Sequence, residues 1–142
     1  MSETTAPRDI GIEKSTHPFY ERIKQGNILP ELKNYEMAYI FIFAMAYGVH
    51  YGKRKKLDDR RPTISKNFLE NNFGWLIRAV AIQSSPEGVE IIPDEAEIYH
   101  IAEEYANGGI NYIQEEIDAS GPGQFEKDME NELIDIISNM KD

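Results

Sequence analysis

Apolar positions along the chain form one continuous run followed by several periodic stripes. Residues 38–49 are all apolar, aromatic or Gly, so no face of this segment is suited to water. The run is too short to span a bilayer, which needs about 20 residues, and too long for a typical strand of about 5 to 6 residues. The pattern therefore predicts a buried central helix over residues 32–51.

Two further helices are predicted on either side of the central one. A short helix opens at Ser15 or Thr16, both N-capping residue types, and ends at the next Gly-Asn pair. Ser65 is the expected N-cap of a longer helix over residues 65–83, which carries apolar residues at helical spacing. Residues 89–92 follow as a short extended segment.

A Gly pair interrupts the next apolar stripe without changing its phase. Asn107, Gly108 and Gly109 are a stop signal by local propensity, but the apolar residues before and after them share one helical register. We expect a single helix over residues 94–118. The two glycines should cost this helix about 2 kcal/mol of stability relative to two alanines.

Small residues of the central helix match this Gly pair. Ala44, Gly48 and Gly52 are spaced by four positions, so they lie on one helix face and allow another backbone to approach closely. We expect that face to pack against Gly108 and Gly109 within one core. The alternative is a seam between the two copies of a homodimer.

The last helix is predicted over residues 124–140, after a Ser-Gly-Pro-Gly break. Its apolar stripe consists of Phe125, Met129, Leu133, Ile136, Ile137 and Met140. Residues 1–14 mix Ser, Thr, Pro and charges without periodicity and are expected to be a disordered tail. The predicted fold class is all-α, with residues 15–142 forming a single-domain bundle of four main helices and one short N-terminal helix.

Composition narrows the classes of function. The 142 residues include no Cys, which excludes a disulfide framework, a thiolate zinc site and a cysteine nucleophile. The N-terminus lacks the basic start and apolar run of a secretory signal, and no stretch is long enough to cross a membrane. We therefore expect a cytoplasmic protein.

No set of residues in the sequence indicates catalysis. Glu97 and His100 form one E-x-x-H pair on a helix face, whereas carboxylate-bridged di-metal bundles carry two such pairs. A nucleophile with a base and an orienting group is not recognisable either. We expect a protein that is not an enzyme and binds no metal or cofactor. The alternative is a hydrolase that uses Glu97 or His100.

The charge distribution singles out one loop. Residues 53–61 hold six of the fifteen basic residues and two of the 25 acidic ones, so this basic loop is +4 and the rest of the chain is −14. Lysine and arginine contact DNA phosphates without reading sequence. The candidate phosphate contacts are Lys53, Arg54, Lys55, Lys56, Arg60 and Arg61. The alternative is a solvated loop that pairs with acidic helices of the same molecule.

Two segments, 41–58 and 103–117, resemble the Dnd system-associated protein 4 family, which is found beside bacterial DNA phosphorothioation genes. The first follows the family pattern F-A-x-x-x-G-x-x-x-G-x-R, and the second follows E-x-A-N-G-G. The matching positions are Phe43, Ala44, Gly48, Gly52 and Arg54, then Glu104, Ala106, Asn107, Gly108 and Gly109. The resemblance covers about residues 19–118 and supplies no catalytic residues.

The resemblance implies an accessory component of an anti-phage defence locus linked to DNA modification and restriction. One hypothesis is an accessory or adaptor subunit that contacts a larger nuclease or ATPase and reaches DNA through the basic loop. The other is a small acidic regulator or inhibitor that mimics DNA in the groove of a nuclease. Reversing Asp128, Glu132 and Asp135 would abolish function only under the second hypothesis.

Overall fold

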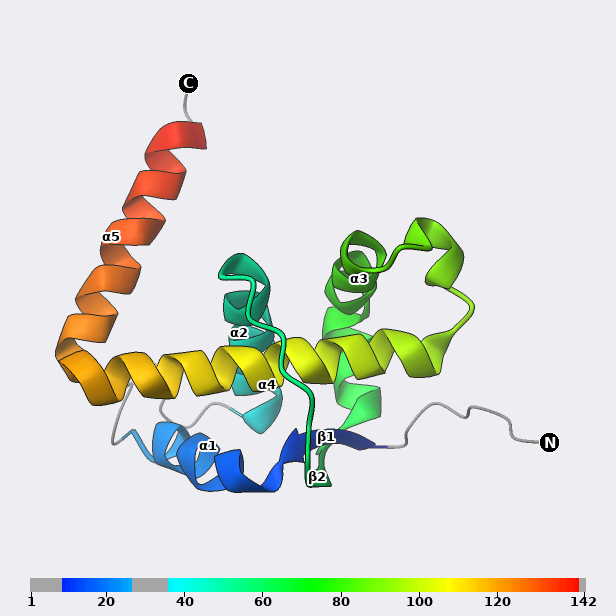
Figure 1. Ribbon diagram of the computed structural model, residues 1–142, viewed down its shortest axis with the longest axis horizontal. Helices are drawn as coiled ribbons and strands as arrows, with labels where there is room; N and C mark the ends of the chain where they lie inside the picture. The colour runs from blue at the N-terminus through cyan, green and yellow to red at the C-terminus, as the bar shows by residue number, and fades with distance from the viewer. Residues whose placement is uncertain (1–8, 27–35, 141–142) are drawn as a thin grey trace.

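A long helix, α4 (Glu95–Ser120), runs across the molecule, and the other elements are arranged along it. In this computed structural model, which describes residues 9–26 and 36–140, helices α2 and α3 cross α4, and α1 lies beside a pair of short strands (Figure 1). The remaining elements are β1 (Asp9–Glu13), α1 (His17–Lys24), α2 (Met37–His50), β2 (Arg60–Ser65), α3 (Lys66–Ser84) and α5 (Pro122–Met140).

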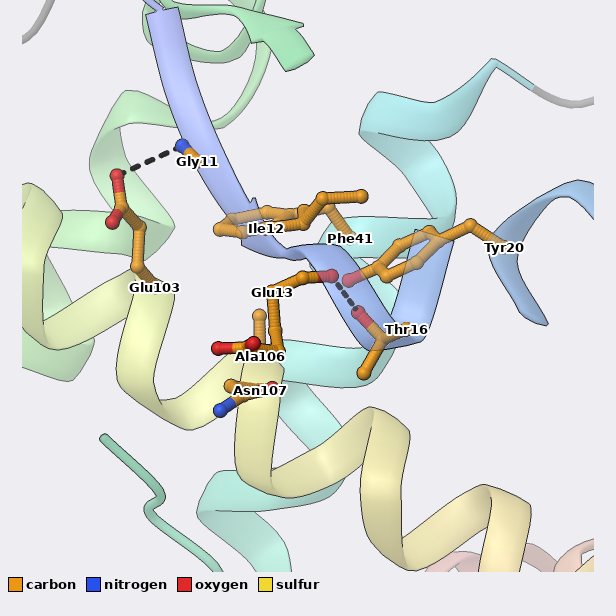
Figure 2. A pocket seen from close by; sticks show the side chains of 9 residues that line it. All are labelled: Gly11, Ile12, Glu13, Thr16, Tyr20, Phe41, Glu103, Ala106 and Asn107. Atoms are coloured by element: carbon orange, nitrogen blue, oxygen red, sulfur yellow. Dashed lines mark hydrogen bonds between the residues drawn. The ribbon is translucent and has the colours of Figure 1, made fainter. Parts of the chain in front are cut away.

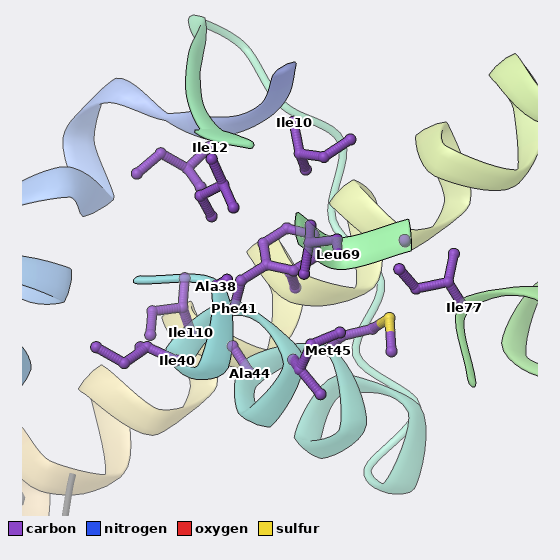
Figure 3. Close-up of a cluster of buried hydrophobic side chains, with 14 of the residues drawn as sticks. Ile10, Ile12, Ala38, Ile40, Phe41, Ala44, Met45, Leu69, Ile77 and Ile110 are labelled. Carbon is purple, nitrogen blue, oxygen red and sulfur yellow. The ribbon is translucent and has the colours of Figure 1, made fainter. Parts of the chain in front are cut away.

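The central helix predicted from the apolar run is α2. Its side chains enter one buried core together with residues from β1, α3 and α4 (Figure 3). Phe41 and Met45 are both fully buried there. The predicted first turn, residues 32–35, lies outside the described residues. The helix ends where Gly52 takes a φ of 65°, a left-handed conformation that favours Gly.

The helix predicted to continue through the Asn-Gly-Gly segment does so. A Cβ on Gly109 would lie 1.8 Å from the carbonyl oxygen of Ala44, and one on Gly48 would lie 2.2 Å from that of Tyr105. Only a chain without a Cβ at these positions lets α2 and α4 approach so closely. Tertiary packing therefore outweighs the low helix propensity of the two glycines.

The prediction of an all-α fold is wrong in one respect, because β1 and β2 form a two-stranded antiparallel sheet. Ile10 pairs with Ile64, and both side chains are buried. The expected disordered tail over residues 1–14 is therefore wrong for residues 9–14, while residues 1–8 lie outside the described residues. Ile10 and Ile12 point to the same side of the strand, and their burial outweighs the polar composition around them.

Smaller differences between the predicted and the observed elements lie at the turns and helix ends. Residues 89–92, expected to be extended, lie mostly in a 3-10 turn, η3 (Gly88–Ile91). The last helix starts at Pro122, two residues earlier than predicted, because Pro is tolerated in a first helical turn and Gly121, with a φ of 86°, ends α4. The predicted N-cap of α3 is confirmed, since the Ser65 hydroxyl accepts a hydrogen bond from the Phe68 amide at 3.2 Å.

The apolar stripe of α5 is only partly covered, contrary to the prediction of a helix packed into the bundle. Phe125 is buried and Met129 is partly buried. Leu133, Ile134 and Ile137 are exposed, since α5 leaves the end of α4 and points away from it (Figure 1). No helix among residues 9–26 and 36–140 has the length and apolar character needed to cross a membrane.

Candidate functional site

The backbone of the basic loop lies along α4 and is fixed by polar contacts to α2 and α4. The Lys53 amide donates to the carbonyl oxygen of Gly48 at 2.7 Å, and the Lys55 amide donates to that of Glu104 at 3.0 Å. The Asn107 side-chain amide donates to the carbonyl oxygens of both Lys55 and Lys56 at 3.2 Å. The E-x-A-N-G-G motif of α4 thus holds the basic loop, which begins at the end of the first motif.

Gly108 allows this close approach. A Cβ at Gly108 would lie 2.1 Å from the carbonyl oxygen of Lys53. A larger residue would therefore push the loop away from α4. Gly52, whose conformation turns the chain from α2 into the loop, would meet nothing within 4 Å if it carried a Cβ. The two glycines act differently: Gly52 allows the turn, and Gly108 allows the contact. The prediction that Gly52 lies on the packing face of the central helix is therefore wrong, because α2 ends at His50 and a Cβ at Gly52 would have no close neighbour.

The side chains of the loop's first four cations differ in their surroundings. The Arg54 guanidinium bonds Glu104 at 2.7 Å and lies over the Tyr105 ring, and the Lys53 ammonium lies 5.0 Å from the centroid of Tyr112. Lys55 and Lys56 are exposed, and within the described part of the chain their ammonium groups have no ion pair. These two lysines can reach an external anion without breaking an internal contact.

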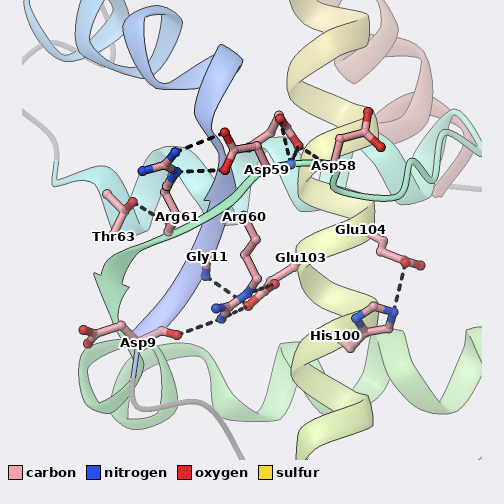
Figure 4. Close-up of polar contacts among 11 residues, drawn as sticks. Asp9, Gly11, Asp58, Asp59, Arg60, Arg61, Thr63, His100, Glu103 and Glu104 are labelled. Carbon is pink, nitrogen blue, oxygen red and sulfur yellow. Dashed lines mark hydrogen bonds and ion pairs between the residues drawn. The ribbon is translucent and has the colours of Figure 1, made fainter.

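Arg60, by contrast, is bound to a buried carboxylate, although its own side chain remains partly exposed (Figure 4). Its guanidinium makes two hydrogen bonds of 2.8 Å to Glu103, whose side chain is only 4% exposed, and a third of 3.0 Å to the carbonyl oxygen of Asp9. Glu103 also accepts a hydrogen bond from the Gly11 amide at 3.0 Å. These contacts raise the pKa of Arg60 and join α4 to both strands.

Arg61 lies on the surface and pairs with Asp59 at 2.9 Å. The Arg61 guanidinium holds the pKa of the Asp59 carboxyl below its usual range. The six candidate cations therefore do not form one cluster. Lys53 to Lys56 lie together on α4, Arg60 is a structural contact, and Arg61 is paired with a neighbour in sequence. The alternative interpretation, in which the cations of the loop pair with carboxylates of the same molecule, applies to Arg54, Arg60 and Arg61.

An aromatic cluster connects the basic loop to α5. The rings of Tyr47, Tyr51 and Tyr112 pack against one another in tilted pairs, with centroids 4.8 Å apart for Tyr47 and Tyr51 and 4.9 Å apart for Tyr51 and Tyr112. Phe125 of α5 adds a fourth ring, 5.6 Å from Tyr47. Since Lys53 lies over Tyr112, the loop and α5 share this cluster.

Glu132 of α5 is the polar contact of that cluster. The Tyr51 hydroxyl donates to one of its carboxylate oxygens, and His50 bonds the other. Hydrogen bonds from Tyr51 and His50 lower the pKa of the Glu132 carboxyl. Burial and the bond to Glu132 raise the pKa of the Tyr51 hydroxyl.

The Glu97 and His100 pair does not form a ligand set. The Nε2 atom of His100 lies 2.9 Å from a carboxylate oxygen of Glu104, one helical turn away (Figure 4). The same carboxylate holds Arg54. Among the residues that the structure describes, no three His, Asp or Glu side chains are grouped as a metal site.

A crevice lined by β1, α1, α2 and α4 contains Glu103, a residue that sequence reasoning missed (Figure 2). Glu103 and Asn107 line it beside Tyr20, yet the crevice has no space for a water molecule, so it is a packed contact. Burial raises the pKa of the Tyr20 hydroxyl. The sequence offers one indication for Glu103: it lies in the predicted helix between Ala102 and Ala106, two small apolar residues of a type that is often buried, and a buried charge requires a partner of opposite charge.

The fold and the loop together define a class of protein: a small helical protein in which two glycine-lined helices cross and the second helix holds a basic loop. The chain belongs to the family of DNA sulphur modification system-associated protein 4, whose model matches residues 34–142. The suspected family is therefore confirmed. The match extends through α5, which the resemblance had left out, and begins after α1. Neither a search of curated proteins nor a search of solved structures gave a significant match.

Proposed function

We propose that this protein is a non-enzymatic accessory subunit of a DNA sulphur modification system, acting in the cytoplasm in anti-phage defence. It contacts a larger protein of that system, a nuclease or an ATPase, and contacts DNA phosphates through the basic loop. Family membership supports the link to the system. The observation that carries the DNA contact is the pair Lys55 and Lys56, exposed on a backbone fixed to α4.

A fixed loop binds phosphates at a lower entropic cost than a free one. Ordering one backbone residue costs about 1 to 2 kcal/mol, and here residues 53–56 are already ordered by the contacts with Gly48, Glu104 and Asn107. The lysine side chains remain available for the ligand. The −14 charge of the remaining chain repels DNA elsewhere and so orients the protein with the loop toward the duplex.

The test is fluorescence anisotropy with a labelled duplex, plain or phosphorothioated, over a salt range of about 50 to 200 mM. Each phosphate contact contributes about one unit to the slope of log K against log salt. The double variant Lys55→Ala/Lys56→Ala should lower that slope by about two units. The matched control is Lys14→Ala/Lys127→Ala, which removes the same charge from exposed positions outside the loop and should leave binding nearly unchanged.

A salt-independent affinity, or equal losses in the loop variant and its control, would remove the loop from the proposed function. A preference for the phosphorothioated duplex that survives the loop variant would place recognition of the modification elsewhere on the protein.

The acidic face of α5 favours a second candidate, a regulator that mimics DNA in a nuclease groove. Asp128, Glu130 and Asp135 are exposed on this helix. The discriminating measurement is phage resistance of a strain carrying the system. Reversing Asp128 and Asp135 to Lys should abolish it if the protein is a mimic, whereas Lys55→Ala/Lys56→Ala should abolish it if the protein is a DNA-contacting subunit.

A further inference from the structure

Helix α5 is attached to the molecule along its first half only. Phe125 is buried against Tyr47, and Glu132 bonds Tyr51 and His50. Among the side chains that the structure describes beyond Glu132, Leu133 is 55% exposed and Ile137 is 46% exposed. Large apolar side chains that gather on one exposed helix face are typical of an interaction surface.

An open groove lies where this exposed face meets α2. Its walls are formed mainly by Phe43 and Tyr47 of α2 and by Met129 and Leu133 of α5, with His50 and Glu132 also lining it. The groove measures about 170 Å³. Pockets for drug-sized ligands are larger, about 300 to 1,000 Å³. The groove therefore suits the anchoring side chains of a protein partner better than a small molecule.

The charge around the groove selects the chemistry of that partner. Helix α5 carries five carboxylates and one lysine, and one of these carboxylates, Glu132, lines the groove itself. A second copy of α5, or a DNA strand, would place like charges face to face at this surface. A cationic chain would instead gain charge complementarity with Glu130 and Glu132.

We infer that the groove between α2 and α5 binds a cationic amphipathic helix of the partner protein. Apolar side chains of that helix, spaced by three and four residues, contact Leu133 and Ile137 and enter the groove beside Tyr47, while its Lys or Arg side chains meet Glu130 and Glu132. This inference rests on the proposed function, because it names the chemistry by which the accessory subunit recognises its partner.

The test uses the full chain and three labelled synthetic peptides of about 14 residues, a typical helix length. The first has Leu at helical spacing with Lys elsewhere, the second has Glu in place of Lys, and the third has the first composition in scrambled order. Anisotropy at about 150 mM salt, where exposed charges are well screened, should show binding of the first peptide at least tenfold tighter than of the other two.

Two matched double variants locate the contact. Leu133→Ser/Ile137→Ser should weaken binding of the first peptide at least tenfold, because both side chains lie on the proposed surface. Val89→Ser/Ile92→Ser removes exposed apolar side chains at η3 and should change binding less than twofold. All four positions are exposed, so circular dichroism should show both variants folded.

The inference would be overturned by equal binding of the scrambled peptide or by no binding of the first peptide at about 100 μM. Equal losses in the two double variants would also overturn it. A dimer in sedimentation that Leu133→Ser/Ile137→Ser dissolves would also overturn it, because the surface would then belong to a second copy. Peptide binding is measured without DNA and should survive Lys55→Ala/Lys56→Ala. Failure of the groove and failure of the DNA contact are therefore distinguishable.

Discussion

The side-chain amide of Asn107 lies 3.2 Å from the carbonyl oxygen of Lys55 and donates a hydrogen bond to it. The same amide also bonds the next carbonyl, that of Lys56. One buried side chain of α4 therefore fixes two successive peptide units of the basic loop, so the position of the lysines depends on a residue that lies about fifty positions away in the sequence.

Replacing Asn107 with Ala should release the loop. The variant loses both hydrogen bonds and leaves the two carbonyl oxygens without their donor, so the free energy of unfolding should fall by about 1 to 3 kcal/mol. Urea unfolding measures this loss, and hydrogen exchange of amides 53–57 should become faster. Asn72→Ala is the control, because Asn72 is exposed and its side-chain amide bonds the carbonyl oxygen of Phe68, far from the basic loop in sequence. Unchanged exchange at 53–57 would mean that other contacts hold the loop.

Gly109→Ala should destabilise the crossing of α2 and α4. The new Cβ would meet the carbonyl oxygen of Ala44 at 1.8 Å, and backbone atoms inside two packed helices cannot move aside. We expect a loss of about 2 to 3 kcal/mol in thermal or urea unfolding.

Gly123→Ala is the matched control for Gly109→Ala, since a Cβ there would have nothing within 4 Å. Alanine favours a helix more than glycine does, so this variant should be neutral or more stable by up to about 1 kcal/mol. Equal stability of the two variants would contradict the close approach of the helices.

Arg60 and Arg61 are neighbours in sequence, but removing them should reduce stability by very different amounts. Arg60→Ala leaves the buried Glu103 carboxylate without its cation, which should cost about 2 to 3 kcal/mol of stability. Arg61→Ala breaks an exposed pair with Asp59 and should cost less than about 1 kcal/mol. Urea unfolding of the two variants provides the comparison. A cost for Arg61→Ala as large as that for Arg60→Ala would show that burial of Glu103 is not the cause.

Acid should loosen the attachment of α5. Hydrogen bonds from Tyr51 and His50 lower the pKa of Glu132 below its ordinary value of 4.5, so the ionised carboxylate stabilises the folded state. That stabilisation is present above pH 4.5 and is lost as the pH falls through the lower folded-state pKa. Near-ultraviolet circular dichroism of the tyrosine cluster should change in this acid window.

Glu132→Gln should remove the acid-induced change, because the amide does not titrate. Glu130→Gln, an exposed neighbour on the same helix, should retain it. The attribution to Glu132 fails if the change persists in Glu132→Gln or disappears in Glu130→Gln.

Local signals in the sequence were sufficient for the main helices. The apolar run of 38–49 has no polar face, so it predicts a buried helix. The unbroken register around Asn107 and Gly109 predicts a single α4. Both inferences hold because periodicity and capping depend on residues within one or two turns, as at Ser65. The basic loop was also apparent, because charge density is read directly from the sequence.

Contacts between distant segments were decided by the tertiary structure. The pairing of Ile10 with Ile64 and of Arg60 with Glu103 joins residues that are more than forty positions apart, and no local pattern states which partner each will meet. The path of the chain also decides that Lys55 is exposed while Arg60 is bound. In α5, periodicity predicts an apolar stripe at Leu133 and Ile137, but burial requires a neighbouring surface, and α2 ends at His50 before it can cover them.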